Sequence, residues 1–415
     1  MNNTRSKLIF WQVFAYIGLN IAYYIISSEF YYMGFEFEPD ILYLLLGTIL
    51  FVLLLIIGFA IKDSFIFSIY NILLIYWLAG EVIFFIYNPD SYFILPLIIF
   101  FLLILLIGIS FVNVKLGPTK TFKNPNRKLS VLAVIMFVPF LISYYRYIDL
   151  RNLLFVDVYE TREVFRGVGN VVTGYMNAPL SRVVLPVLII INILKKNYKL
   201  TILFSLMILY IYLSGALKSV FLGLILLFFF YTGDLISKSL RFIKLVSFLT
   251  VGGSTLFFFT GNIFLLDAFT RRVFFTPAYL NNRYIEYFQD NFTYLAHSPF
   301  GFNLVVNRYS DLDLSLSRYF GEVVMATSGL NANVGVLTEG YLSFGIIGGL
   351  LTAFVIALII YYFKFIDLDQ RFFGIVFVFI YYFYTSFFST LLLTHGLLFF
   401  MIISVFFLRK GMIKG

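Results

Sequence analysis

Long apolar runs alternate with short polar connections along almost the whole chain. A helix needs about 20 mainly apolar residues to cross roughly 30 Å of hydrocarbon, and most of the runs approach this length. The ten-residue alternating segments that would indicate barrel strands are absent, so we expect an all-α polytopic membrane protein with about twelve transmembrane helices. The predicted spans are 8–27, 41–61, 64–87, 92–113, 129–145, 180–194, 200–216, 219–233, 245–261, 336–362, 372–388 and 390–408.

The charges between these runs predict the orientation of the chain. If Arg5 and Lys7 hold the N-terminus in the cytoplasm, every second connection is cytoplasmic, and each of these carries lysine. Both termini are then cytoplasmic. The cytoplasmic connections are too short to contain a nucleotide-binding domain. We expect a single integral membrane domain over 1–415, with an external loop at 146–179 and a large external loop at 262–333, and loops of such length are usually functional.

The composition agrees with this class of protein. Of the 415 residues, 61% are hydrophobic and only 12% are charged. This hydrophobic share exceeds the share that a soluble domain needs. The net charge of +9 is explained by lysines that hold cytoplasmic loops against anionic lipid, so nucleic acid is not an expected partner. The chain has no cysteine, which excludes disulfides, a catalytic thiolate and a cysteine metal site.

Lysine and arginine divide unequally between the two predicted sides of the membrane. Fourteen of the fifteen lysines fall inside, whereas ten of the fifteen arginines fall outside. Lysine suffices to hold a loop inside, but the planar guanidinium group binds phosphate or carboxylate oxygens at two points at once. The external arginines as a group therefore favour an anion site. They are Arg146, Arg151, Arg162, Arg166, Arg182, Arg271, Arg272, Arg283, Arg308 and Arg318.

A structural alternative exists for each of these arginines, because each can pair with a nearby carboxylate. For any single arginine this explanation is as good as ligand binding. The carboxylates available for such pairs are Asp157, Glu160, Glu163, Asp267, Glu286 and Asp290.

Four charged residues within or at the ends of predicted spans point to the same outer face. Lys218 lies in the turn SGALKS, Arg182 opens a span, and Glu81 and Glu339 lie in the outer parts of theirs. Ionisable groups within a membrane are costly and usually face a cavity, so we expect a polar chamber open to the outer leaflet. Snorkelling to the interface is the alternative for the two basic residues, but glutamate is too short for it.

The chain contains two histidines, His297 in the large loop and His395 near the end of the last span. Neither has the neighbours that a metal site requires, so we expect no metal. His297 is a candidate acid or base, and an ordinary loop histidine is the simpler interpretation.

Three segments resemble motifs of the oligosaccharide repeat-unit polymerases, the Wzy-type or O-antigen polymerases, which are related to the O-antigen ligases. HSPFGFN (297–303) resembles a proline-glycine turn of that family in a shortened form. GLNANVGVLTEGYLSFGIIGG (329–349) resembles its Asn-rich segment leading into a glutamate and a Gly-rich helix. SGALKS (214–219) stands where many relatives carry a small residue followed by a basic one, although Lys218 replaces the more usual arginine.

The resemblance implies a GT-C-like glycosyltransferase with helical external loops in the bacterial cytoplasmic (inner) membrane. Such an enzyme polymerises lipid-linked repeat units at the outer face, for O-antigen, lipopolysaccharide or capsule. Its donor is an undecaprenyl-pyrophosphate-linked oligosaccharide, since nucleotide sugars are cytoplasmic, and arginines would stabilise the leaving pyrophosphate without a metal or cofactor. Membrane lipid and a chain-length regulator protein are the other partners that it implies.

Within this hypothesis, Glu339 is the expected base for the acceptor hydroxyl and His297 assists it. Other carboxylates that could serve as the base are Glu81, Glu163 and Glu322. The expected substrate contacts are Arg162, Arg166, Arg271, Arg272, Arg283, Lys218, Asn331 and Asn333.

Two alternatives remain. An O-antigen ligase would transfer finished glycan to a different acceptor. A flippase for lipid-linked oligosaccharide would place its charges at mid-membrane along a two-sided path.

Overall fold

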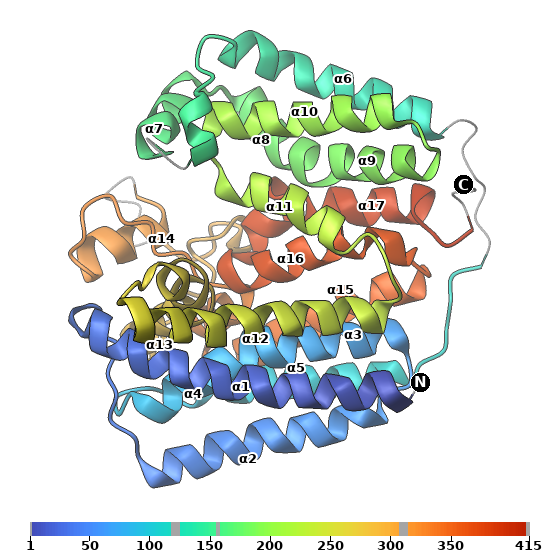
Figure 1. The fold of residues 1–415 in the computed structure, drawn as a ribbon. Helices are drawn as coiled ribbons and strands as arrows, with labels where there is room; N and C mark the ends of the chain where they lie inside the picture. The colour runs from blue at the N-terminus through green and yellow to red at the C-terminus, as the bar shows by residue number, and fades with distance from the viewer. Residues whose placement is uncertain (1, 118–124, 155–157, 307–313, 412–415) are drawn as a thin grey trace. The chain divides into compact units, whose positions relative to one another are not determined.

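The computed structural model of the chain describes residues 2–117, 125–154, 158–306 and 314–411 (Figure 1). Within these residues all named elements are helices, so the predicted all-α class is confirmed. Asp157 and Arg308, which the sequence analysis names, lie outside the described residues, as do three of the lysines expected in the cytoplasm, Lys120, Lys123 and Lys414.

Eight helices of the described residues are long and apolar enough to cross a membrane. The chain is therefore a multi-pass membrane protein. Four further predicted spans coincide with shorter helices, and the count of twelve stays a prediction. The eight are Thr4–Met33, Ile41–Ala60, Ser64–Tyr87, Asn126–Tyr144, Val171–Leu194, Tyr198–Gly215, Leu235–Thr260 and Val336–Phe365. The four shorter ones are α5 (Ile94–Ser110), α11 (Lys218–Phe229), α16 (Phe373–Thr385) and α17 (Leu397–Phe407).

The chain forms two compact units. Unit 1 contains Met1–Asn113, Asp234–Tyr362 and Phe383–Phe388. Unit 2 contains Val114–Gly233, Phe363–Tyr382 and Ser389–Gly415. Each unit thus combines segments that are far apart in the sequence. The single integral membrane domain over 1–415 stays a prediction.

In unit 1, the helix of Ser64–Tyr87 forms the centre. It consists of α3 (Ser64–Leu73), the π-helical segment η3 (Leu74–Leu78) and α4 (Ala79–Tyr87). Its most apolar window is 100% buried, as expected for a helix that is hydrophobic on all sides. The side chain of Asp63 caps its first turn by accepting from two backbone N–H groups.

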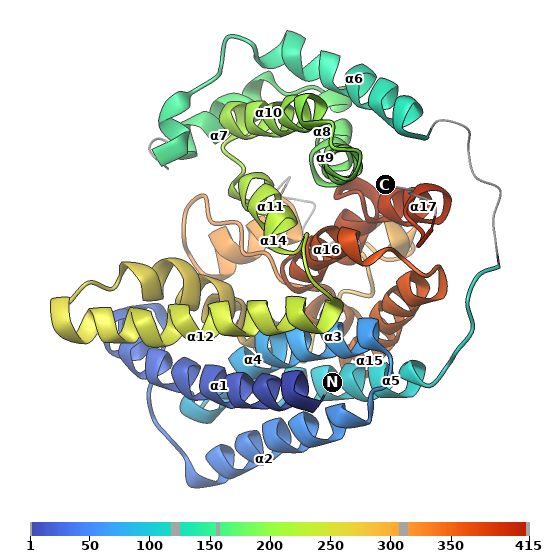
Figure 2. The same cartoon turned by 45° about the vertical axis from the view of Figure 1, so that its right-hand side comes forward.

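The other long helices of unit 1 surround this centre. α1 (Asn2–Phe30) and α12 (Leu235–Thr260) lie side by side along most of their length in both views (Figures 1 and 2). α2 (Ile41–Ile57) packs on α4, and α5 packs on α3. The predicted large external loop is itself partly helical, with η6 (Leu266–Phe275), α13 (Thr276–Phe288), α14 (Leu316–Tyr319) and η9 (Phe320–Val324).

α15 (Val336–Phe365) is interrupted after its second turn. Phe344 and Gly345 leave the helical conformation, and Gly345 has a φ of 62°, which glycine adopts without steric cost. A Cβ at Gly345 would lie 3.0 Å from the ring of Phe292, which leaves little room for a side chain. The kink separates a short first segment, which carries Thr338, Glu339 and Ser343, from the longer apolar remainder.

In unit 2, α8 (Val171–Ala178), the π-helical η5 (Pro179–Val184) and α9 (Leu185–Leu194) form one continuous helix. Asn170 and Thr173 begin it with a capping box. The span predicted at 180–194 therefore extends further towards the N-terminus, and Arg182 lies inside the helix rather than at its start. α9 packs on α10 (Tyr198–Gly215), and α6 (Pro125–Tyr144) contacts both.

Candidate functional site

The structure brings His297 and Glu339 together in unit 1. His297 Nε2 lies 3.4 Å from Glu339 Oε1, and the two side chains are only 2% and 3% exposed. Neither of these two atoms has a hydrogen-bond partner among the described residues. The separation is longer than a formed hydrogen bond, and catalytic pairs often tighten only when substrate is bound.

The other atoms of this pair are held in place. Glu339 Oε2 accepts a hydrogen bond from the backbone N–H of Phe388. The ring of Phe387 lies 5.2 Å from the imidazole, centroid to centroid. On the far side of the imidazole, Nδ1 lies 3.1 Å from Thr293 Oγ1. One end of the pair is therefore anchored to the segment after α16, and the other to the loop after α13.

Backbone pairing explains why the loop meets α15 at this point. The N–H groups of Thr293 and Tyr294 donate to the carbonyls of Leu342 and Ser343, at 2.9 and 3.2 Å. The Ser343 hydroxyl in turn donates to the Glu339 carbonyl at 2.7 Å. The carbonyls next to the kink of α15 thus accept hydrogen bonds from the loop after α13, and this pairing holds His297 beside Glu339.

The loop around His297 has an unusual backbone. Four of its non-glycine residues have positive φ, namely Tyr294, Leu295, Phe302 and Asn303. Such residues are sparse in proteins and cluster where the surrounding structure holds a functional site. The turn HSPFGFN closes when Ser298 caps η7 (Pro299–Gly301). Gly301 is required there because a Cβ would overlap the Leu295 carbonyl oxygen.

A pocket of about 280 Å³ opens beside the pair. Thr293 belongs to its lining and also contacts His297 Nδ1. The pocket combines aromatic rings, a carboxylate and an amide, which together suit a ligand with apolar faces and hydroxyl groups. It is lined by Asp290, Asn291, Phe292, Thr293, Tyr294, Ala296, Val305 and Val306.

A second buried carboxylate, Glu81 of α4, lies in a polar network of the same unit. Glu81 Oε1 accepts from Tyr384 Oη at 2.5 Å and from Asn281 Nδ2 at 2.7 Å. Asn281 Oδ1 accepts from Thr338 Oγ1 at 2.8 Å. Thr338 directly precedes Glu339, so the network fixes the first turn of α15. The indole of Trp77 stacks on the Tyr384 ring at 5.5 Å.

The two predicted asparagines, Asn331 and Asn333, have exposed side chains. Between them Ala332 is fully buried, and its carbonyl accepts from Tyr284 Oη at 2.8 Å. Burial raises the pKa of Tyr284, so its hydroxyl remains a donor. The segment thus runs along the surface of a small apolar cluster that includes Phe288 and Phe320.

The predicted arginines of unit 1 pair locally with carboxylates. Arg271 is buried, forms an ion pair with Asp267 and lies over the ring of Phe30. Arg272 Nη2 lies 3.7 Å from the same Asp267. Arg283 pairs with Glu286 at 2.7 Å. The structural alternative from the sequence analysis therefore applies to these three, and the structure does not gather them in one cluster around His297.

In unit 2, Arg162 binds the backbone of the SGALKS turn, which contains Lys218. Arg162 of α7 (Val158–Val168) donates through Nε to the carbonyl of Ala216 at 3.2 Å. Ala216 has a φ of 46° and ends α10, and Lys218 begins α11 two residues later. The backbone of Arg166 lies on α7, but its side chain is outside what the structure describes.

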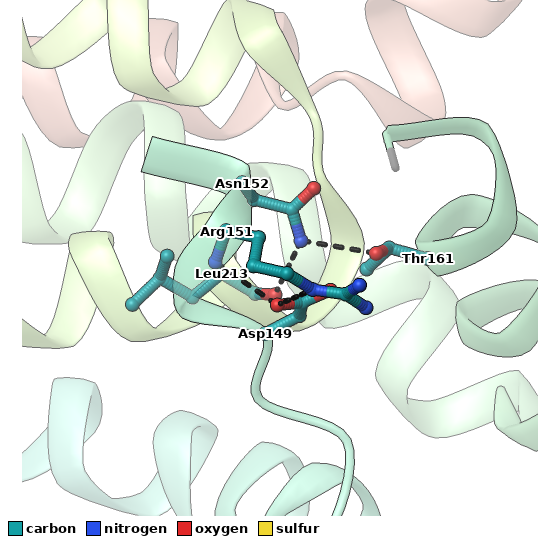
Figure 3. Close-up of polar contacts among 5 residues, drawn as sticks. All are labelled: Asp149, Arg151, Asn152, Thr161 and Leu213. Carbon is teal, nitrogen blue, oxygen red and sulfur yellow. Dashed lines mark hydrogen bonds and ion pairs between the residues drawn. The ribbon is translucent and has the colours of Figure 1, made fainter. Parts of the chain in front are cut away.

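Polar contacts fasten the 146–179 loop to α10 (Figure 3). Asn152 donates to Thr161 Oγ1 at 3.0 Å and to the Leu213 carbonyl at 3.4 Å. Arg151 binds both carboxylate oxygens of Asp149, and this hydrogen bonding lowers the pKa of Asp149. An open hollow of about 360 Å³ adjoins these residues. Its charges are mixed, with Arg146, Arg151, Asp149 and Glu160 in the lining.

Within the ranges that the structure describes, no three His, Cys, Asp or Glu residues are grouped as metal ligands. His297 and Glu339 were predicted from the sequence, whereas Thr293, Asn281 and Tyr384 were not. These are common residue types without a spacing signal, and only the fold reveals their contacts. No protein-family model, curated protein or solved structure matches this chain, so the family resemblance stays a prediction.

Proposed function

We propose that this chain is a metal-independent membrane glycosyltransferase with a GT-C-like arrangement of about twelve spans. It joins lipid-linked oligosaccharide repeat units at the outer face of the bacterial cytoplasmic membrane. The donor is glycan on undecaprenyl pyrophosphate, and the product is a longer surface polysaccharide on the same lipid carrier. The observation that carries this proposal is the buried His297–Glu339 pair. Thr293 connects this pair to the 290–306 pocket, because its hydroxyl group contacts His297 Nδ1 and its side chain belongs to the pocket lining.

The contacts of the pair favour one tautomer of His297. The Glu339 carboxylate can only accept, so Nε2 carries the proton that faces it. Nδ1 then presents a lone pair to Thr293 Oγ1. In this arrangement His297 is the proton acceptor, and Glu339 orients the imidazole and stabilises the imidazolium, as a carboxylate does in hydrolase triads. This assignment exchanges the two roles expected from sequence.

The pocket provides a place for the acceptor sugar. Phe292 and Tyr294 offer aromatic faces, while Asp290 and Asn291 offer hydrogen-bonding groups. The acceptor hydroxyl attacks the anomeric carbon of the donor, and its proton passes through Thr293 Oγ1 to His297 Nδ1. The anomeric C–O bond breaks, and its electron pair leaves with undecaprenyl pyrophosphate. The proton transfer thus uses Thr293, which lines the pocket, and His297, which contacts Thr293.

The exposed arginines suit the departing pyrophosphate. The side chains of Arg272 and Arg283 are 54% and 45% exposed, and exposed ion pairs contribute only about 0–1 kcal/mol. A pyrophosphate can therefore replace their carboxylate partners at little cost. Arg271 is different, because its side chain is only 10% exposed and pairs with Asp267 within η6, so this bond costs more to break.

The substitution Glu339→Gln tests the assignment. The glutamine oxygen can keep the bond from Phe388, but its NH₂ then faces Nε2 and forces the other tautomer. Nδ1 loses its lone pair, and polymerisation should fall by about 10²–10⁴-fold, the usual contribution of a general base. Glu38→Gln, which changes an exposed carboxylate of the same unit, should keep wild-type activity.

The assay uses purified full-length protein with a lipid-linked repeat unit, and neither ATP nor a nucleotide sugar is added. A ladder of products on a gel supports the polymerase. A single transfer to a different acceptor supports the ligase, and transbilayer movement of unchanged substrate supports the flippase. Full polymer yield from Glu339→Gln would remove the pair from the mechanism.

A further inference from the structure

The 290–306 pocket of unit 1 lies next to the C-terminal end of α13. Asp290 and Asn291 follow this helix after the single residue Gln289, and both line the pocket. The last carbonyls of a helix carry the negative end of its dipole, which favours basic side chains nearby. α13 has no basic residue in its last turn, and the next charged group in the sequence is the Asp290 carboxylate. The helix and the side chain together make this end of the pocket negative.

No basic partner explains why a carboxylate stands at this position. Asp290 is exposed, and within the described residues no ion pair includes it. Arg283 of the same helix pairs with Glu286 instead. The described residues that line the pocket include neither lysine nor arginine. Because a carboxylate at the C-terminal end of a helix lowers stability, its presence is better explained by a ligand in the pocket than by the fold.

An exposed aromatic ring lines the same pocket. Tyr294 is 52% exposed and has a φ of 49°, and such backbone strain clusters at ligand sites. Its ring lies 6.4 Å from that of Phe292, at 80° to it. Phe292 is held from the other side by Tyr341 and by the kink at Gly345. A pyranose ring has apolar C–H faces and a rim of hydroxyl groups, so it can contact these aromatic rings and the polar end of the pocket at once.

We propose that the pocket selects an acceptor sugar without negative charge, and that Asp290 is the residue that selects it. This inference rests on the proposed glycosyl transfer and names the class of its acceptor. An ionised carboxylate can only accept hydrogen bonds, and hydroxyl or N–H groups of a hexose or an N-acylated hexosamine donate to it strongly. A sugar acid would place its own carboxylate beside Asp290 and the negative end of α13, where like charges repel.

Saturation-transfer NMR on the purified full-length protein, in a sugar-free detergent at low salt, measures binding without transfer. The probes are methyl hexosides and methyl hexuronides of gluco, galacto and manno configuration, which differ within each pair only in CH₂OH or carboxylate at C6. At least one hexoside should bind, and more tightly than its hexuronide by about 5-fold, the effect of two unit charges about 4 Å apart in water. Equal or tighter binding of the hexuronides, or binding of no hexoside, would overturn the proposal.

Two matched variants assign the preference to Asp290. Asp290→Asn removes the charge from an exposed position and should bring the affinities of hexoside and hexuronide close together. Glu29→Gln is the control, because Glu29 is likewise an exposed carboxylate at the C-terminal end of a helix, α1, and it should retain the full preference. An unchanged preference in Asp290→Asn would refute the assignment.

A transfer assay with the same probes separates this inference from the proposed function. A lipid-linked oligosaccharide serves as the fixed donor, and the hexosides and hexuronides serve as acceptors. If hexosides bind with the expected preference but receive no glycan, the proposed glycosyl transfer fails and the selectivity of the pocket stands. If glycan passes equally well to hexosides and hexuronides, the glycosyl transfer stands and the selectivity fails.

Discussion

Replacing Tyr384 with phenylalanine tests the buried polar network of unit 1, because the change removes one hydroxyl and keeps the ring. The lost group is the donor to Glu81 Oε1 at 2.5 Å. Tyr384 and Glu81 are both buried, so water cannot replace the bond without reorganising the core. The ring stays stacked on Trp77.

The expected cost follows from the chemistry of the bond. A hydrogen bond to a charged group contributes about 1.5–3 kcal/mol to stability. Glu81 keeps one donor, Asn281 Nδ2, so the loss stays within this range. The free energy of unfolding should therefore fall by about 1.5–3 kcal/mol, which corresponds to about 10- to 150-fold in the unfolding constant.

The chain offers a convenient probe for this measurement. It contains two tryptophans, and Trp77 contacts Tyr384 directly. In a Trp11→Phe background, the fluorescence of Trp77 reports on the network during unfolding by SDS in mixed micelles. Tyr24→Phe is the matched control, because Tyr24 is 53% exposed, and a surface change of this kind should stay within about 0.5 kcal/mol.

A double-mutant cycle extends the test to α15. Thr338→Val removes the hydroxyl that donates to Asn281 Oδ1. If Asn281 connects the two bonds, Tyr384→Phe and Thr338→Val should show an interaction energy of at least about 0.5 kcal/mol. The reasoning fails if Tyr384→Phe matches the Tyr24→Phe control, or if the two changes are additive.

Three further predictions concern other parts of the chain. Gly301→Ala should destabilise the protein by about 1–3 kcal/mol, since the new Cβ overlaps the Leu295 carbonyl. Gly174→Ala should not, because a Cβ there has nothing within 4 Å, and denaturation of both variants checks this. Arg409→Lys should cost about 1.5–3 kcal/mol in the same assay, because the buried guanidinium group donates to the carbonyls of Ile366, Gly117 and Leu116. The pKa of Asp149 should lie below the ordinary aspartate value and rise in Arg151→Gln when followed by NMR; since the folded-state pKa is depressed, the contribution of this pair to stability is present above the unfolded pKa and is lost as pH falls through the folded pKa.

The helices were predictable where apolar residues are continuous. The span expected at 64–87 coincides with Ser64–Tyr87. The span expected at 245–261 was too short, because α12 already begins at Leu235. Its first turns contain Lys238, Arg241 and Lys244, and these charges lower the hydropathy of the segment below that of a membrane span. Lys238 is nevertheless buried in the structure. Hydropathy alone therefore locates the apolar centre of a helix better than its charged ends.

The arginines show a different limit. Their number outside the membrane suggested convergence, but three pairs follow ordinary helical spacing, Asp267 to Arg271, Arg283 to Glu286 and Arg318 to Glu322. Side chains three or four positions apart are neighbours on a helix, so these pairs were visible in the sequence once the loop was taken as helical. Helical external loops were expected from the family resemblance, so the local pairing of these arginines follows from that expectation.

The catalytic candidates were named from residue type, whereas their contact depends on the tertiary fold. His297 and Glu339 meet because the loop after α13 pairs with the carbonyls at the kink of α15. Gly345 belongs to the Gly-rich segment that the sequence shows. The sequence does not show that the loop after α13 donates hydrogen bonds to the carbonyls next to this glycine. Backbone bonds of this kind leave no side-chain pattern, so sequence could propose the two residues and could not place them together.

The two buried carboxylates of unit 1 can be distinguished by the way their oxygens are used. Glu81 Oε1 already accepts from both Tyr384 and Asn281, and both donors are buried. Glu339 has one oxygen fixed by the Phe388 N–H, while the other faces His297 without a formed hydrogen bond. A carboxylate that must stabilise a transient imidazolium needs an oxygen that is free to tighten its contact. By this criterion Glu339 suits the chemistry, and Glu81, an alternative base from the sequence, suits a structural role that holds Thr338 and the first turn of α15.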